Sequence, residues 1–357
     1  MINIDKSFIH FVGEKDSWRT NIKSILSTEN KKFFLVKECR NELVGEHPFF
    51  HPGRYEFLGI IEDDKTHSSV NFSAWYTLKK GEASKLQVEL NNNEVSWLYQ
   101  DEIHSLRLDK GNILIENFDD ALQRRVTTTP LQLYTNNHAW QPLTVNTKRT
   151  KNGLLTHISS LELFGIADLY PLFSGHIESE ALFDGLAPVG QISDVYLLKT
   201  IDDFQAFSSF SQLTSSFSQG IPGIKNVSGE LSFADKHLSI DLLAEHGQLD
   251  FNEHFLYPIP YESISSKVDV DFSTADLSVK IKDLEVVSSQ IHATADIEIT
   301  GAENSTPAMA LLANVHRGDV NFADYFYPHL LMGQDLVDYL KASIIDGEVE
   351  QAQVLFN

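Results

Sequence analysis

Two histidines lie four residues apart in the segment His47-Pro48-Phe49-Phe50-His51. On a helix this spacing would place both imidazoles on one side, where they could bind a metal ion such as zinc. Pro48 and Pro52 argue against a helix, because proline lacks the amide donor and clashes with the preceding turn. The neighbouring sequence suggests no third ligand. We therefore favour a structural role for both histidines and predict neither a metal site nor a cofactor.

Asp269, Asp271 and Asp276 resemble the ligands of a calcium loop in their spacing. Such a loop needs a glycine at its sixth position for a sharp turn, and Thr274 stands there instead. The first two aspartates also alternate with hydrophobic residues, as on the solvated face of a strand. A solvated strand face is the favoured interpretation.

The remaining candidates for catalysis are adjacent acids at 63–64, 119–120 and 202–203, and the single cysteine, Cys39. Glycosidases need two carboxylates separated across a cleft, and 50 acidic residues produce adjacent pairs by chance. Cys39 stands beside Arg40 and could be an activated thiol, although an unreactive cysteine is the commoner case. No nucleophile elbow, phosphate-binding glycine loop or zinc-spaced cysteines occur. We therefore predict no catalytic residues and no enzyme.

The net charge limits the partners that the chain can bind. There are 28 Lys and Arg against 50 Asp and Glu, a formal net charge of −22 in 357 residues. Such a surface repels nucleic acid and anionic bilayers, so we expect no nucleic-acid partner and no basic patch. Any anionic headgroup would be held by something other than charge attraction.

The ends of the sequence indicate a segment of a longer protein. Hydrophobic runs are strand-sized, well short of the roughly 18 to 20 residues of a membrane span. Met1–Ser7 is not a signal peptide, which leaves a cytosolic protein or a piece of a larger one. Val354–Asn357 reads as an unfinished strand, so we expect a fragment.

Strand alternation is the main structural signal. From Pro222 to Ile299, hydrophobic and polar residues alternate in five runs joined by short polar breaks, which predicts an antiparallel meander. Similar runs occur between residues 32 and 108. Lys151-Asn152-Gly153 predicts a hairpin between residues 144–150 and 154–158.

Helices are expected to be few. Hydrophobic spacing predicts them at 14–30 and 335–344, the latter with Leu336, Leu340 and Ile344 on one face. A strand end passing into a helical turn is expected at 161–173. Residues 203–217 fit either structure and lean towards a strand.

One face of the meander must be covered, because a large exposed hydrophobic surface promotes aggregation. Two sheets of a β-sandwich could cover each other. Alternatively, the sheet could curl into a trough whose lining is completed by a ligand. Periodicity alone favours the sandwich.

Four sequence blocks in the second half resemble those of the YhdP family in the AsmA-like superfamily. In chain order these are Leu186–Asp194 (LAPVGQISD), Pro222–Gly229 (PGIKNVSG), Leu249–Ser265, and Tyr327–Val349. The match covers residues 151–357, a truncated groove segment. Residues 1–150 resemble the family only in their strand-like alternation of hydrophobic and polar residues, and we expect them to form a second, N-terminal groove segment.

The resemblance implies a mostly β fold: a long twisted antiparallel sheet of repeated strand groups, curled into an open hydrophobic groove with a few short helices. It also implies a bridge-like lipid transfer protein of the periplasm, carrying phospholipids towards the outer membrane. The inner-membrane anchor and the contacts with both membranes would belong to parts of the protein absent here. A β-sandwich module without lipid is the alternative.

On this interpretation, alternate strand residues line the groove. The predicted lining consists of Leu231, Phe233, Leu238, Ile240, Leu242, Leu249, Phe251, Val268, Val270, Phe272, Val279, Ile281, Ile297 and Ile299.

Overall fold

The computed structural model describes residues 25–28, 31–38, 53–62, 66–79, 82–99, 101–117, 124–173, 184–219, 221–273, 277–301, 308–327 and 329–356. The chain divides into two compact units, Met1–Ser160 and Leu161–Asn357.

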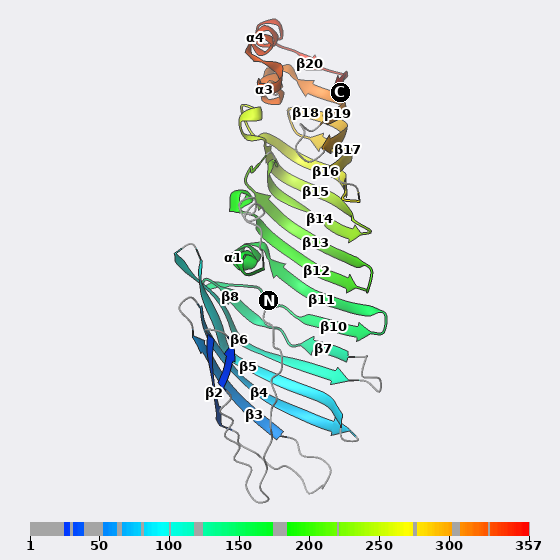
Figure 1. Cartoon of the computed structure of the whole chain (residues 1–357). Helices are drawn as coiled ribbons and strands as arrows, with labels where there is room; N and C mark the ends of the chain where they lie inside the picture. The colour runs from blue at the N-terminus through cyan, green and yellow to red at the C-terminus, as the bar shows by residue number, and fades with distance from the viewer. Residues whose placement is uncertain are drawn as a thin grey trace, which may run out of the picture. The chain divides into compact units, whose positions relative to one another are not determined.

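The first unit is an antiparallel sheet (Figure 1). Its strands are β1 (Ile25–Thr28), β2 (Lys31–Glu38), β3 (Gly53–Glu62), β4 (Thr66–Lys79), β5 (Glu82–Tyr99), β6 (Glu102–Asn117), β7 (Arg124–Thr128), β8 (Gln132–Thr135), β9 (His138–Ala139), β10 (Val145–Thr150) and β11 (Gly153–Glu162), the last crossing the boundary. Strands β1 to β6 each pair with the next. Strand β6 pairs with both β7 and β8, and β10 joins β7 to β11.

The second unit is a longer meander. After α1 (Leu163–Phe173) come β12 (Val189–Lys199), β13 (Phe204–Ser215), β14 (Gly223–Ala234), β15 (His237–Asp250), η1 (Asn252–His254), β16 (Ile259–Asp271), β17 (Leu277–Val287), β18 (Ile291–Gly301) and β19 (Ala308–Asp319). Each strand pairs antiparallel with the next, and Figure 1 shows β12 to β16 side by side.

The second unit ends in short elements beyond β19. These are η2 (Val320–Phe326), α3 (His329–Met332), α4 (Gln334–Ser343), β20 (Glu348–Val349) and β21 (Ala352–Phe356). Both β20 and β21 pair with β19. In the described residues no helix has the length and hydrophobicity to span a membrane.

Most sequence-based expectations are confirmed. The chain is mostly β, its sheet is open and antiparallel, and the helices are few and short. The predicted hairpin joins β10 to β11, residues 163–173 are helical, and the ambiguous segment is strand β13. Helix α4 is present, but its buried residue is Val337, while Leu336 is 45% exposed.

The prediction of a helix at residues 14–30 is wrong for residues 25–28. Residues Ile25–Thr28 form strand β1, in which Ile25 lies opposite Phe34 and Leu26 opposite Phe33. Pairing with β2 thus overrides the helical spacing of a short segment. Residues 14–24 lie outside the described part of the chain, as do His47, His51 and Cys39.

The strands of the second unit carry β-bulges that change the phase of side-chain alternation. On β17, Ile281 lies opposite Ile297 and Leu284 opposite Ala295. Ala295 and Ile297 on β18 are two residues apart and therefore share a face, whereas their partners Ile281 and Leu284 on β17 are three residues apart. One residue is therefore inserted, and hydrophobic side chains on both sides of it stay on the same face.

The inserted position is occupied by a residue with positive φ. Such residues are Asp194 on β12, Gln212 on β13, Asn226 on β14, His246 on β15 and Asp283 on β17, with φ between 50° and 61°. Asn and Asp tolerate this left-handed conformation better than most residues. Because a bulge bends its strand and increases the local twist, bulges on neighbouring strands favour a curved sheet.

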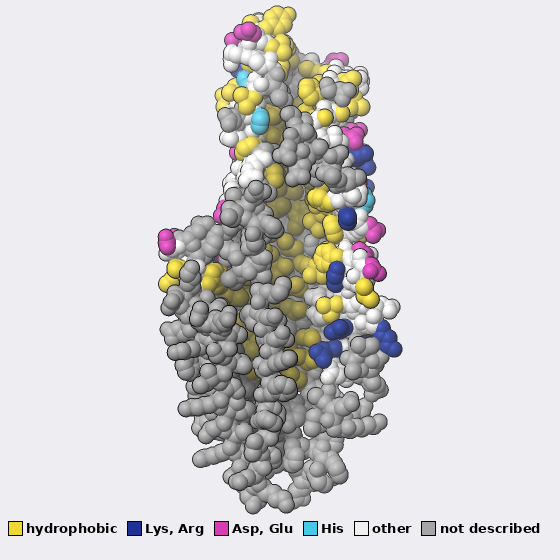
Figure 2. All heavy atoms as spheres, viewed as in Figure 1, with side chains coloured by type: hydrophobic (Ala, Val, Ile, Leu, Met, Phe, Trp, Pro, Cys, Tyr) yellow, Lys and Arg dark blue, Asp and Glu magenta, His cyan; other side chains and the backbone are white. Residues whose placement is uncertain are grey.

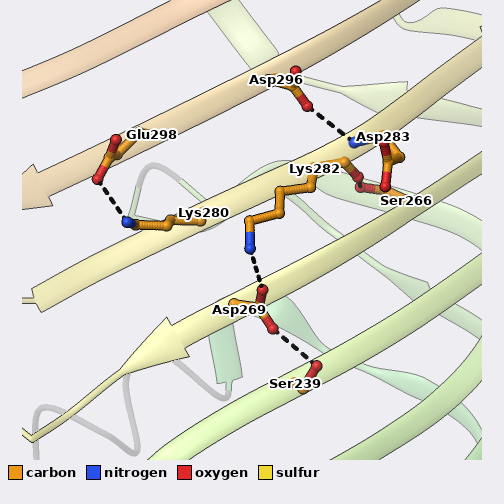
Figure 3. Close-up of polar contacts among 8 residues, drawn as sticks. All are labelled: Ser239, Ser266, Asp269, Lys280, Lys282, Asp283, Asp296 and Glu298. Atoms are coloured by element: carbon orange, nitrogen blue, oxygen red, sulfur yellow. Dashed lines mark hydrogen bonds and ion pairs between the residues drawn. The ribbon is translucent and has the colours of Figure 1, made fainter.

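Side chains of neighbouring strands satisfy the amides at three of these bulges. The amide of Gln212 donates to Ser228 Oγ at 3.2 Å, and that of Asn226 donates to Thr214 Oγ1 at 3.2 Å. The amide of Asp283 donates to Asp296 at 3.1 Å (Figure 3). These bonds replace ladder bonds that the insertion removes.

The best-packed part of the second unit lies beside the bulges. Val227, Ala244, Tyr261 and Ile264 are each at most 4% exposed and pack together. Tyr261 on β16 extends over Gly247 on β15 and donates its hydroxyl to the Lys225 carbonyl on β14 at 2.5 Å. Any side chain at Gly247 would collide with the Tyr261 ring and the Lys225 carbonyl. Burial also raises the pKa of the Tyr261 hydroxyl.

We predict that Tyr261→Phe lowers the free energy of unfolding by about 1–2 kcal/mol, because the Lys225 carbonyl loses its partner next to a bulge. Urea unfolding, monitored by circular dichroism, would measure this change in the free energy of unfolding. Tyr339→Phe is the control, since Tyr339 is 65% exposed and should change stability by less than about 0.5 kcal/mol. Equal stability of Tyr261→Phe and the unsubstituted chain would show that this bond does not hold the bulge region together.

Candidate functional site

The hydrophobic residues predicted from the sequence form two rows across neighbouring strands. Cross-strand register places each residue directly opposite the next one in its row. The first row is Leu231, Ile240, Val268, Ile281 and Ile297, and the second is Phe233, Leu238, Val270, Val279 and Ile299. The structure thus brings ten of the fourteen predicted residues together on one face.

The other four predicted residues lie beside or beyond the rows. Leu242 is opposite Gly229, and Leu249 lies past the bulge on β15, opposite Ile224 and Ile259. Both contact the buried cluster around Val227.

Phe251 and Phe272 lie just outside the strands. The Phe251 ring is 5.1 Å from that of Phe255, and Phe272 is 48% exposed at the end of β16.

Register also adds residues that the sequence prediction omitted. On β19, Leu311 lies opposite Ile297 and Met309 opposite Ile299, so both rows continue onto this strand. The alternation of Met309, Leu311 and Ala313 was the signal that could have identified them. In the other direction, the rows reach Ala206 and Ser208 on β13.

All ten row residues are partly exposed. In the described part of the second unit, no second sheet packs on them, because every strand from β12 to β19 joins the same meander. Figure 2 shows hydrophobic side chains gathered along a recessed face of the described residues. The face therefore keeps hydrophobic surface that a ligand could cover.

The opposite face is polar and is linked by charged pairs (Figure 3). Lys280 pairs with Glu298 at 3.2 Å, and Lys282 with Asp269 at 3.1 Å. Asp269 also accepts a hydrogen bond from Ser239 at 2.9 Å. This arrangement confirms the solvated-face interpretation of Asp269, while Asp276 lies outside the described residues. No group of potential metal ligands occurs in the described part of the chain.

The pKa of Asp269 is lowered, chiefly by the hydrogen bonds from Lys282 and Ser239. A carboxyl group with a lowered folded pKa stabilises the fold above its unfolded pKa of about 3.9 and loses that contribution as the pH falls through the folded value. We therefore predict that Asp269→Asn destabilises the chain at pH 7 by less than about 1 kcal/mol, since the pair is exposed.

Urea unfolding at pH 7 and in acid would test this prediction. The difference from the unsubstituted chain should shrink as the pH falls below about 3.9. Asp241→Asn, on the same face, is the control, because no hydrogen bond to the Asp241 side chain occurs in the described residues. A stability difference between Asp269→Asn and the unsubstituted chain that stays the same in acid would contradict a lowered pKa for Asp269.

Comparison with known proteins gives two matches. The profile of a family described as "YhdP protein" matches residues 50–357. The "Intermembrane phospholipid transporter YhdP" of Escherichia coli (strain K12) is 24% identical over 314 residues. This alignment covers 83% of the present chain and 25% of the relative, so the chain spans about a quarter of that protein's length. No solved structure matches the chain.

The family match includes the second-half blocks that carry the sequence resemblance and extends to residue 50, into the part where only strand texture suggested it. The resemblance is confirmed: the chain belongs to the YhdP family.

Proposed function

We propose that this chain is a segment of an envelope-spanning lipid transfer bridge. Phospholipid acyl chains lie along the hydrophobic face, and headgroups stay in water at an open seam. The single observation that carries the proposal is the pair of hydrophobic rows, which run unbroken in register from β14 to β19. The relative's name, an intermembrane phospholipid transporter, supports phospholipid as the ligand.

The bulges support a curled sheet. Neighbouring strands β12 to β15 each carry a residue with φ of 50–61°, and each insertion bends its strand. The same insertions keep hydrophobic side chains on one face beyond the bend. A trough formed in this way would have a hydrophobic interior and a polar exterior, as the charged pairs around Asp269 suggest.

Burial of the acyl chain supplies the binding energy. Each buried methylene contributes about 0.8 kcal/mol, so a chain of some sixteen carbons gains on the order of 10 kcal/mol. From β14 to β18 the rows consist of aliphatic residues of similar size with one Phe, so this energy varies little from strand to strand. A lipid can then move along the rows without being trapped at one strand.

We place this chain in the periplasm, as part of a protein anchored to the inner membrane, and assign it no enzymatic activity. The competing function, a β-sandwich module without lipid, needs a second sheet over the rows. The partial exposure of all ten row residues weighs against it.

Photo-crosslinking amino acids at Ile240 and at Asp241 would test the lipid assignment in cells. These neighbours point to opposite faces of β15, since Ile240 is in a row and Asp241 is exposed opposite Glu230. We expect phospholipid adducts at Ile240 and at least about tenfold fewer at Asp241, because strand side chains alternate between faces.

The adducts should be identified by mass spectrometry. A second matched pair, Ile281 and Lys280 on β17, controls for local effects because these residues also lie on opposite faces. Equal lipid adducts on both faces would contradict the proposal.

A further inference from the structure

A basic segment interrupts the acidic chain in the first unit. Of 357 residues 50 are acidic, yet none occurs from Ala121 to Leu161. The same stretch contains Arg124, Arg125, Lys148, Arg149 and Lys151. The expectation that the chain has no basic patch is therefore wrong, because the total charge hides a local excess of the opposite sign.

Strand register brings four of these residues together. Arg124 of β7 lies directly opposite Arg149 of β10, and Arg125 lies opposite Lys148. Like charges directly opposite each other destabilise a sheet. None of the four is ion-paired to a carboxylate in the described part of the chain, and all four are exposed. Stability of the fold thus gives no reason for this arrangement, which indicates an anionic ligand.

The two pairs lie on opposite faces of the sheet. Arg124 shares a face with Val126, which is opposite Ile115 of β6 and Thr147 of β10. Arg149 is on this face too, opposite Leu154 of β11. The first unit thus has a partly exposed hydrophobic face with two arginines at its end.

The second pair, Arg125 and Lys148, lies on the other face, where Glu116 is opposite Arg125. Figure 2 shows Lys and Arg side chains gathered at the rim, level with the ends of β7 and β10 in Figure 1 and next to hydrophobic side chains.

A neighbouring side chain orients one of the arginines. Arg124 Nε donates to Asn117 Oδ1 at 3.1 Å, and Asn117 lies opposite it on β6. A guanidinium presents paired N–H donors that match phosphate oxygens, and such charge-assisted bonds are stronger than neutral ones.

We propose that Arg124 and Arg149 bind the phosphodiester of a phospholipid headgroup while its acyl chains lie along the face that contains Ile115 and Val126. This inference rests on the proposed function and adds to it a place where the headgroup is held. Local charge attraction then acts on the headgroup even though the whole chain is acidic.

The test uses the full chain with a photo-crosslinking amino acid at Leu154, which is 39% exposed and lies opposite Arg149. The probe is vesicles of phosphatidylglycerol, and lipid adducts are counted by mass spectrometry. Arg124→Gln with Arg149→Gln should reduce adducts at Leu154 at least about fivefold, through loss of charge-assisted bonds to phosphate. Arg125→Gln with Lys148→Gln removes the same charge from the other face and should reduce them less than about twofold, as screened surface charges do.

The outcomes separate the site from its alternatives. Equal losses in both double variants would show general attraction to the vesicle, and no loss in the first would exclude the arginines; either overturns the inference. Adducts at Ile240 without any at Leu154 would overturn the headgroup site but leave the proposed function standing. Adducts at neither position would contradict the proposed function. The first double variant should unfold at the same or a higher urea concentration, because it relieves repulsion.

Inorganic phosphate distinguishes a lipid headgroup from a free anion. Phosphate should compete weakly with lipid at Leu154, since it gains nothing from the hydrophobic face. Two results together would show a site for free phosphate and contradict the lipid assignment. The first is that millimolar phosphate binds to the unsubstituted chain and not to the Arg124→Gln, Arg149→Gln variant. The second is that this variant forms as many lipid adducts as the unsubstituted chain.

Discussion

The alternation of strand side chains is the constraint on which the second unit depends. A strand that bends by inserting a residue would normally turn its remaining hydrophobic side chains to the other face. Here the insertion coincides with a phase change in the sequence, so Ile281 and Leu284 share a face although they are three residues apart. The sheet can therefore bend at Asp283 and keep one continuous hydrophobic face. Strands β13 and β14, which pair with each other, repeat this solution at Gln212 and Asn226.

The proposed curvature of the sheet and the proposed binding of lipid both depend on this one feature. At the bulges the strands are tied by Tyr261, which connects three strands through the Lys225 carbonyl, and the side chains there are buried. Away from the bulges, the two rows stay partly exposed. A line of buried packing beside an open hydrophobic surface would suit the proposed sliding lipid, because the packed side chains hold neighbouring strands together. Charged pairs on the other face, such as Lys282 with Asp269, keep that face in water.

Alternation was enough to predict the meander and the ten row residues on β14 to β18, because each of these strands shows the period of two. It was not enough for the bulges, although their signal is present: Val279 and Ile281 are followed by Leu284 and Val286, with Asp283 at the phase change. Register cannot be read from one strand, so the pairing of Arg124 with Arg149 needed the structure. The short helix predicted near the N-terminus is wrong at Ile25–Thr28, where pairing with β2 outweighs local spacing.

Native mass spectrometry of the purified full chain would show whether the hydrophobic face carries phospholipid. We expect co-purified phospholipid on the unsubstituted chain, and its loss when Ile240→Asp and Ile281→Asp place charges within one row. The matched control, Asp241→Asn with Lys280→Gln on the opposite face, should retain the lipid. A folded, monomeric chain that carries no phospholipid, or one that carries it equally in both double variants, would contradict the claim that this hydrophobic face holds lipid.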